Sequence, residues 1–364
     1  MVEKTKKRIY VCHTFYHVLV TFLKELSLPV EEQGKATLVL SKMSNDFGAL
    51  KEQIEKTGYF EDVLWFDEKR ETFFPALDKY KKNRGNIVIN MFYRIRFVRK
   101  FAKLQAPYVP VDFREYENIY VFCDSDPIGI YLNMNHIYYH AMEDGLDCLK
   151  TLDSARVGNI GHFELKEKFA RKNLIFMENG HSKYCIDMEV NNRSVIKYDF
   201  EKYVEVPRAP LYERLTPEDK DLLLRAFVAN KEEIETSIGL MKAGRESVLI
   251  LSDPLCDLET RKRIMDDLLA TYGKAKDGSD AIVFIKPHPR DVLDYKANYP
   301  NLPQFDAKVP MGLLSFVEGI HCTKVVSVFT ELSAITYAEE KIRLGGEFMD
   351  QYEDPMIHNY NERI

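Results

Sequence analysis

The 364-residue sequence lacks long apolar segments: no run approaches the ~18 apolar residues that a membrane-spanning helix needs. The apolar run after the basic N-terminus MVEKTKKRIYVC is also too short for the core of a secretory signal peptide. We therefore expect a cytoplasmic protein without a transmembrane anchor. An excess of positive charge is missing as well, since the formal net charge is -6. No nucleic-acid partner is expected, because nucleic-acid binders carry a strongly basic domain.

Paired cysteines and glycine-rich nucleotide motifs are also absent. No CxxC pair occurs, so the six single cysteines predict buried free thiols rather than zinc or redox chemistry. Without GxGxxG or GxxxxGK[ST], neither the usual dinucleotide fold nor a P-loop is supported. The nearest candidate for a metal-binding DxD pair is the DSD at 124–126, and it fits the start of a helix better. We predict no metal site and no bound cofactor.

Strand-like and helix-like segments alternate along the chain. Such alternation predicts parallel sheets covered by helices on both faces, that is, an α/β fold with doubly wound domains. The expected strands are 8–12, 36–42, 62–66, 86–90, 118–124, 247–252, 281–286 and 324–329. The expected helices include 14–26, 47–56, 258–272, 311–318 and 331–340.

The alternation is interrupted between about 197 and 246, where two prolines flank a polar stretch and a helix begins near Thr216. We interpret residues 1–200 as an N-terminal domain, 201–246 as a linker region and 247–364 as a C-terminal domain. Two such domains would leave a cleft between them, and ligands of these sheets bind beyond the carboxyl ends of the strands.

The first polar motif at a predicted strand end is MEDG. Adjacent strand side chains point to opposite faces, so one of Glu143 and Asp144 can face a ligand while the other is tied down. Gly145 permits a close backbone approach or a positive φ. The motif suits a general base held by its neighbour, and a solvated turn is the simpler alternative.

The second motif is FIKPHPRD, in which Pro287 and Pro289 stiffen the chain around His288. With Lys286 and Arg290 beside it, His288 lies in a concentration of positive charge at a strand end. This arrangement predicts a binding site for a phosphate.

The third motif, VVSVFTELSA, places the hydroxyls of Ser327, Thr330 and Ser333 around a predicted strand-to-helix junction. Free N–H groups at such a junction favour an anion, although a plain N-cap by Thr330 is the alternative. Ser252 ends the preceding strand SVLILS and either contacts a nucleotide or belongs to a simple turn.

Near the N-terminus, His13, Thr14 and His17 follow the first predicted strand and are candidates for the acceptor side of a cleft, or for plain packing. The basic and aromatic run at 93–103 is typical of a solvated helix face. Its composition also suits a membrane surface or an acidic glycolipid, so peripheral association with the inner face of a membrane stays open. A homodimer stays open too.

The order EDG, HP and Ser/Thr across two α/β domains resembles the bacterial sialyltransferases. The opening segment YVCHTFYHVLVTFLKEL is similar to that of glycosyltransferase family 52. One departure is Glu331, which follows Thr330 where relatives often have a second hydroxyl. The resemblance implies a GT-B architecture and transfer of a sugar from a CMP-linked donor, with inversion and without a metal.

The same resemblance implies roles for the three motifs. Glu143 or Asp144 would take a proton from an acceptor hydroxyl, and His288 with the Ser/Thr motif would bind the departing phosphate. The expected partners are a CMP-sugar donor, above all CMP-Neu5Ac, and an oligosaccharide or glycolipid acceptor in surface polysaccharide or lipooligosaccharide synthesis. The alternatives are a CMP-Kdo, CDP-glycerol or CDP-ribitol donor, and a non-catalytic nucleotide- or saccharide-binding protein of the same fold.

Overall fold

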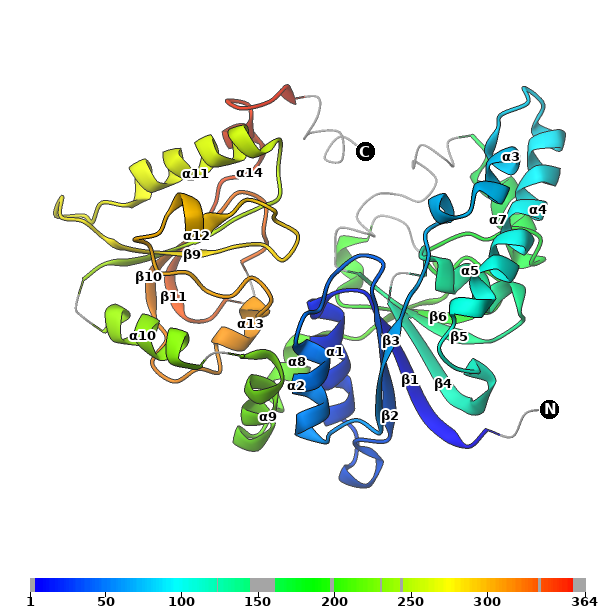
Figure 1. Ribbon diagram of the computed structural model, residues 1–364, viewed down its shortest axis with the longest axis horizontal. Helices are drawn as coiled ribbons and strands as arrows, with labels where there is room; N and C mark the ends of the chain where they lie inside the picture. The colour runs from blue at the N-terminus through cyan, green and yellow to red at the C-terminus, as the bar shows by residue number, and fades with distance from the viewer. Residues whose placement is uncertain are drawn as a thin grey trace. The chain divides into compact units, whose positions relative to one another are not determined.

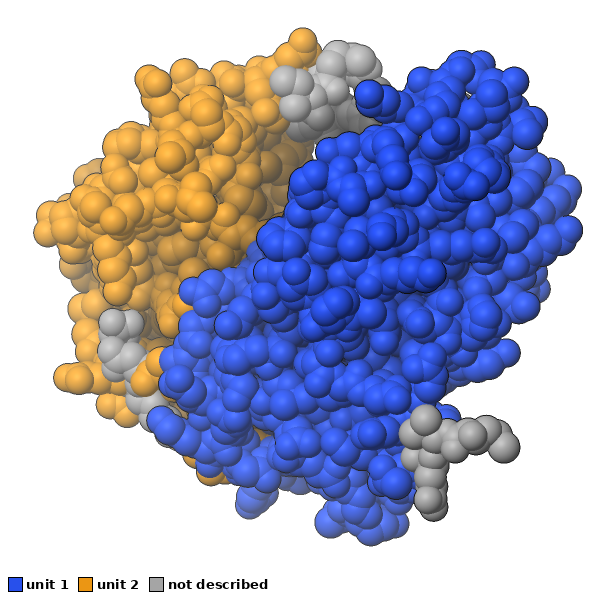
Figure 2. All heavy atoms as spheres, turned by 45° about the vertical axis from the view of Figure 1, so that its right-hand side comes forward, with its two compact units in different colours: residues 1–219 blue, residues 220–364 orange. Residues whose placement is uncertain are grey.

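The protein was analysed as a computed structural model that describes residues 4–122, 124–144, 161–196, 200–229, 231–242, 245–332 and 335–355. Two predicted site residues, Gly145 and Ser333, lie outside these residues. The chain forms two compact units, Met1–Asp219 and Lys220–Ile364, which are coloured separately in Figure 2. Their division falls inside the segment predicted as a linker.

The first unit contains a parallel sheet in the order β3-β2-β1-β4-β5-β6-β7. The strands are β1 Lys6–Cys12, β2 Ala36–Ser41, β3 Asp62–Phe66, β4 Tyr116–Phe122, β5 Tyr139–Met142, β6 Cys185–Val190 and β7 Tyr203–Glu205. Its helices are α1 Phe15–Leu26, α2 Leu50–Thr57, α3 Asp78–Lys81, α4 Ile87–Gln105, α5 Pro127–Met134, α7 Phe163–Arg171 and α8 Ala209–Glu213. Helix α9, Pro217–Phe227, spans the division between the units.

Helices cover both faces of this sheet. Figure 1 shows α1 and α2 on one side of the strands and α4, α5 and α7 on the other. Strand β1 illustrates why both faces are apolar: Ile9 and Val11 pack in a core cluster with Ile128 of α5, whereas the thiol of Cys12 contacts Thr21 of α1. The strand order reverses at β1 and β4, so the carboxyl ends of β1, β4 and β5 lie together at one edge of the sheet.

The second unit contains a parallel sheet in the order β11-β10-β8-β9. Its elements are α10 Lys231–Met241, β8 Ser247–Leu251, α11 Leu258–Tyr272, β9 Ile282–Lys286, α12 Tyr295–Asn298, α13 Met311–Leu314, β10 Cys322–Ser327, β11 Ala338–Arg343 and α14 Gly345–Met349. One core cluster joins Ile250 of β8, Ile285 of β9 and Val326 of β10 to Met265 of α11 and Met349 of α14. The HP motif follows β9 and the Ser/Thr motif follows β10, and these two strands lie on either side of β8.

The α/β class with parallel sheets is confirmed, but two predicted elements are wrong. Segment 86–90 is not a strand: Asn86 caps α4, because its side-chain oxygen accepts hydrogen bonds from the N–H groups of Val88 and Ile89 at 2.9 and 3.2 Å. The apolar residues of this segment are between 44% and 74% exposed (Ile87, Val88 and Ile89). They therefore form no buried strand.

The second wrong element is the helix predicted at 331–340, since no described residue of this segment is helical. Residues Ala338–Arg343 form β11 instead and pair in parallel with β10, with Ser327 opposite Arg343. Pairing with an existing strand outweighs the helix propensity of YAEEK. The predicted helix 311–318 is also shorter than expected and ends at Leu314.

Candidate active site

The carboxylates of Glu143 and Asp144 have different environments, as the alternation of strand side chains predicts. Glu143 is 1% exposed, and its Oε2 accepts a hydrogen bond from the N–H of Asn191 at 2.9 Å. Its Oε1 has no partner among the described residues, and burial raises the pKa of Glu143. The Asp144 side chain is 40% exposed. Glu143 therefore anchors the end of β5, and Asp144 presents its carboxylate to solvent.

Asp144 is held by His17. The His17 Nε2 lies 2.5 Å from the Asp144 Oδ1, and the buried imidazole stacks on Phe122 with ring centroids 4.4 Å apart. The Nδ1 of His17 accepts a hydrogen bond from the His13 N–H at 3.0 Å, so the proton of a neutral ring lies on Nε2. Burial lowers the pKa of His17 although Asp144 opposes this effect. His17 thus donates a hydrogen bond to Asp144 as a neutral imidazole.

Thr14 fixes this histidine from the start of α1, because its hydroxyl accepts a hydrogen bond from the His17 N–H at 3.2 Å. This is the N-cap interaction that Thr commonly makes. Of the three acceptor-side candidates, Thr14 and His17 therefore position Asp144. His13 instead contacts two other carboxylates, Glu68 and Asp126.

The His13 Nε2 lies 2.7 Å from Glu68 Oε2 and 3.3 Å from Asp126 Oδ2. Burial alone would lower the pKa of His13, but the two carboxylates outweigh it and raise the pKa to about 9. Burial, opposed by His13, raises the pKa of Asp126 to about 7. The His13 Nδ1 has no hydrogen-bond partner in the described part of the chain. His13 is therefore a buried cation next to Asp126.

Glu68 was missed by the sequence analysis, although it follows the strand end DVLWF by two residues. Its Oε1 accepts a hydrogen bond from the Ile128 N–H at 2.7 Å, and its Oε2 accepts one from the Ser41 hydroxyl at 2.7 Å. Asp126 occupies the N-cap position of α5 but makes no capping hydrogen bond with its side chain. The expected cap by the DSD segment is therefore replaced at the Ile128 N–H by Glu68, which leaves Asp126 directed at His13.

In the second unit, His288 keeps a free donor at the end of β9. Its main-chain N–H donates to the Ser252 hydroxyl at 3.0 Å, and its Nδ1 accepts from the Arg290 N–H at 3.1 Å. Burial, with Arg290 and Lys286, lowers the pKa of His288. The ring is therefore neutral near pH 7 with its proton on Nε2, which bonds to no described residue. Pro289 and Arg290 are exposed.

Two residues near His288 that were predicted to bind phosphate make hydrogen bonds within the unit. Ser252 donates to Asp291 Oδ2 at 2.8 Å, and Asp291 also pairs with Arg261 at 2.6 Å. Lys286 is buried and donates to the carbonyl of Ala307 at 2.9 Å, and burial lowers its pKa to about 7. Ser252 and Lys286 therefore position the loop that carries His288. The sequence analysis gave no role to Asp291 of the FIKPHPRD motif, which anchors this loop through Ser252 and Arg261.

The Ser/Thr motif is also occupied by internal contacts. The buried Ser327 hydroxyl donates to the carbonyl of Thr330 at 2.8 Å. Asp253 Oδ1 accepts from the Thr330 hydroxyl at 2.6 Å, and its Oδ2 accepts from the Val328 and Phe329 N–H groups at 3.2 and 3.1 Å. The Asp253 carboxylate thus binds the two N–H groups and the Thr330 hydroxyl next to the predicted anion site. The predicted helix N-terminus is also absent here, because the described part of 331–340 contains no helix.

Glu331 is turned away from this group of hydroxyls. Its Oε1 accepts a hydrogen bond from the Leu332 N–H at 3.0 Å, and its Oε2 lies 3.7 Å from the Arg343 Nη1. This exposed ion pair with Arg343 of β11 places the carboxylate at the edge of the sheet. The departure from the resembled motif is therefore accommodated on the surface.

The two units with parallel sheets define a GT-B-like α/β fold. Comparison with known proteins identifies the group: residues 65–345 match glycosyltransferase family 52, and the chain belongs to this family. Both the predicted family and the predicted fold are confirmed. Among the described residues, no helix is long and apolar enough to cross a membrane.

Solved structures with this fold include a 2,6-sialyltransferase from a Photobacterium species in complex with CMP and lactose. The sequences are 10% identical, the TM-score is 0.55, and the match covers 92% of this chain and 71% of that chain. A sialyltransferase from Photobacterium damsela has 11% identity and a TM-score of 0.49, covering 92% of this chain and 73% of that one. An uncharacterized Haemophilus influenzae protein is 28% identical over 137 residues, or 37% of this chain. This match spans only 42% of that protein's length.

Proposed function

We propose that the chain transfers a sugar from a CMP-linked donor, most simply sialic acid from CMP-Neu5Ac, to a hydroxyl of a saccharide acceptor. The transfer would serve the synthesis of a surface polysaccharide or lipooligosaccharide. One observation carries the proposal: in a family 52 chain, Asp144 presents an exposed carboxylate that a neutral histidine holds at 2.5 Å. That arrangement suits a general base acting on an external hydroxyl.

In the proposed reaction, the acceptor oxygen attacks the anomeric carbon of the donor while Asp144 takes the hydroxyl proton. The bond between this carbon and the CMP phosphate oxygen breaks, and CMP leaves with the bonding electrons. A single direct displacement inverts the anomeric configuration. His17 keeps Asp144 in place through a hydrogen bond to one carboxylate oxygen, Oδ1.

His288 would stabilise the leaving phosphate through its Nε2–H. Charge develops on this phosphate as the bond breaks, so a preorganised donor strengthens its hydrogen bond in the transition state. Arg290, exposed two residues later, supplies a positive charge on the same loop. Metal independence is part of the proposal, since these groups would balance the charge of the departing phosphate.

A donor panel tests the proposal. The protein is incubated with CMP-Neu5Ac, CMP-Kdo, CDP-glycerol, CDP-ribitol and UDP-sugars, with and without EDTA, and nucleotide release is measured. We expect release of CMP from CMP-Neu5Ac that EDTA does not suppress. Turnover of CMP-Kdo or a CDP donor alone would reassign the donor. Binding of CMP without hydrolysis or transfer would instead indicate a non-catalytic protein.

A further inference from the structure

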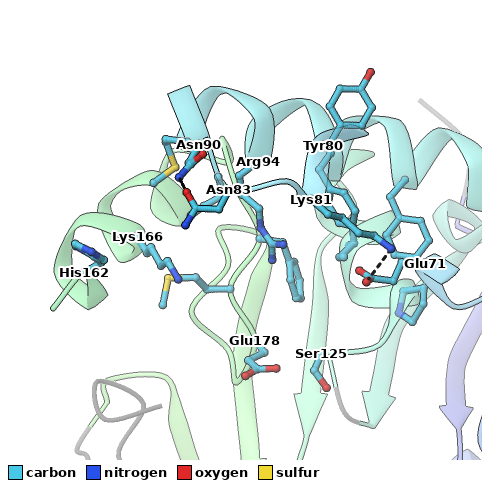
Figure 3. Close-up of a pocket in the computed structure, with 18 of the residues that line it drawn as sticks. Glu71, Tyr80, Lys81, Asn83, Asn90, Arg94, Ser125, His162, Lys166 and Glu178 are labelled. Carbon is cyan, nitrogen blue, oxygen red and sulfur yellow. Dashed lines mark hydrogen bonds and ion pairs between the residues drawn. The ribbon is translucent and has the colours of Figure 1, made fainter. Parts of the chain in front are cut away.

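A large pocket lies within the first unit, beside the group formed by His13 and Asp126. Its volume is about 1250 Å³, which exceeds the ~300–1,000 Å³ of common small-molecule sites. Figure 3 shows its walls, which come from the segment before α4, from α4 itself and from α7. Asp126 and Ser125, which precede α5, line the same pocket.

The pocket is richer in positive than in negative groups, although the whole chain is acidic. The described residues that line it include five cationic side chains (Arg70, Lys81, Lys82, Arg94 and Lys166) and three carboxylates (Glu71, Asp126 and Glu178). One pair cancels, because Lys81 Nζ lies 3.2 Å from Glu71 Oε1. A surplus of positive charge in a concave surface attracts anions.

Arg94 is the central cation of this pocket. Figure 3 shows it between Lys166 and the pair formed by Lys81 and Glu71. Its guanidinium lies over the ring of Phe97, 5.3 Å from the centroid. It makes no hydrogen bond or ion pair with any described residue, although burial lowers its pKa and the charges of Glu71 and Glu178 oppose this effect. The planar guanidinium therefore keeps its donors available for a carboxylate or a phosphate.

A like charge faces Arg94 across the pocket. Burial, and then the charge of Arg94, lower the pKa of Lys166. The two cations therefore repel each other. An anion between them would relieve this repulsion and gain a charge-assisted contact with Arg94.

The pocket also lies near the candidate base, Asp144. Asp126, in its wall, lies 3.3 Å from His13, and the main-chain N–H of His13 donates to His17, which holds Asp144. The charge of Asp144 acts on both His13 and Asp126, so Asp144 lies near the wall of the pocket that Asp126 forms. A saccharide whose hydroxyl reaches Asp144 can therefore extend past Asp126 into the pocket. The pocket is thus placed to bind a part of the acceptor remote from the reacting hydroxyl.

We propose that this pocket binds an anionic group, a carboxylate or a phosphate, carried by the acceptor saccharide, and that Arg94 is its main ligand. The acceptor part of this inference rests on the proposed function. It assigns the acceptor to the acidic saccharides, and it makes Arg94 a specificity-determining residue.

Binding measurements test the inference without requiring turnover. Isothermal titration calorimetry compares 3′-sialyllactose with lactose for a carboxylate, and galactose 6-phosphate with galactose for a phosphate. Saturating CMP is present so that the nucleotide site is filled. We expect at least one acidic ligand to bind about tenfold or more tightly than its neutral counterpart, the size of one charge-assisted contact. The pair with the larger difference identifies the anion.

Matched variants assign the preference to the pocket. Arg94→Gln should reduce the preference for the acidic ligand to less than about twofold and leave the affinity for the neutral ligand unchanged. Arg99→Gln is the control, because Arg99 is exposed on the same helix and does not line the pocket. Arg94→Lys should retain part of the preference, since a point charge replaces a planar fork.

Two results would overturn the inference: equal affinities of the wild-type protein for acidic and neutral ligands, including no binding of either, or the same preference in the Arg94→Gln and Arg99→Gln variants. Hydrolysis of CMP-Neu5Ac without acceptor, measured on the same preparations, reports on the proposed function separately. It requires neither an acceptor nor Arg94. Hydrolysis that persists while the preference is absent would refute the acidic acceptor alone.

Discussion

The substitutions Asp144→Asn and Glu143→Gln separate the two carboxylates of the EDG motif. Both keep the shape of the side chain and remove its basicity. In Asp144→Asn the amide oxygen can still accept the hydrogen bond of His17 Nε2, so this change should alter the free energy of unfolding by less than about 1 kcal/mol. Loss of the base should lower transfer by about 10²–10⁴-fold, equivalent to about 3–5 kcal/mol of transition-state stabilisation.

Glu143→Gln should give the opposite profile. The amide oxygen can replace Oε2 as the acceptor of the Asn191 N–H, but the amide NH₂ then takes the place of Oε1, which has no partner among the described residues. An unsatisfied buried donor costs about 1–3 kcal/mol, so the loss should appear in stability. Transfer by the folded protein should stay within about tenfold of the wild type.

The assay measures kcat and KM for transfer from CMP-Neu5Ac to an acceptor series that begins with lactose and 3′-sialyllactose. Calorimetry gives the Kd for CMP, and urea unfolding gives stability. CMP affinity should be unchanged in Asp144→Asn because the base acts on the acceptor. Near wild-type transfer by Asp144→Asn, or an equal catalytic loss in Glu143→Gln, would refute the assignment of Asp144 as the base.

Three further predictions follow from the other polar groups. Because the pKa of His13 is raised to about 9, its contribution to stability is complete below about pH 6.5 and is lost as pH rises toward 9. Urea unfolding should therefore show a smaller fall in the free energy of unfolding between about pH 6.5 and pH 9 in His13→Gln than in the wild type. The same pH dependence in both proteins would contradict this prediction. Because the pKa of His288 is lowered, CMP affinity should increase as pH falls below about 6.5, and calorimetry of His288→Gln should show weaker binding without the histidine-dependent part of this increase. Ser252→Ala removes the links to the His288 N–H and Asp291, so it should cost about 1–3 kcal/mol in urea unfolding and weaken CMP binding, whereas unchanged values would exclude a positioning role.

The sequence was informative where local pattern and tertiary structure agree. Apolar runs such as SVLIL and IVFIK form parallel strands as predicted, and the placement of polar motifs at strand ends followed from them. Alternation predicted that one of Glu143 and Asp144 is held in place while the other faces outward, but the facing of β5 was needed to tell that Glu143 is the buried one. That facing depends on which neighbours β5 pairs with, which no local pattern reveals.

The remaining site could not be predicted because it depends on contacts between residues distant in sequence. Asp253 occupies the N–H groups of Val328 and Phe329, 75 and 76 residues away, so hydroxyls that seemed available for phosphate are already engaged. Glu68 contacts His13 across 55 residues. The strand predicted at 86–90 was wrong for a local reason, since the capping Asn86 begins a helix whose apolar first turn is exposed.

The most direct test of the account is the time course of CMP-Neu5Ac with an acceptor in EDTA, followed by proton NMR for the wild-type protein and Asp144→Asn. The wild type should form a glycoside whose anomeric configuration is opposite to that of the donor, and Asp144→Asn should form it at least about a hundredfold more slowly. A product that retains the donor configuration, transfer that requires a UDP-sugar and a divalent metal, or equal rates in the two proteins would contradict the account.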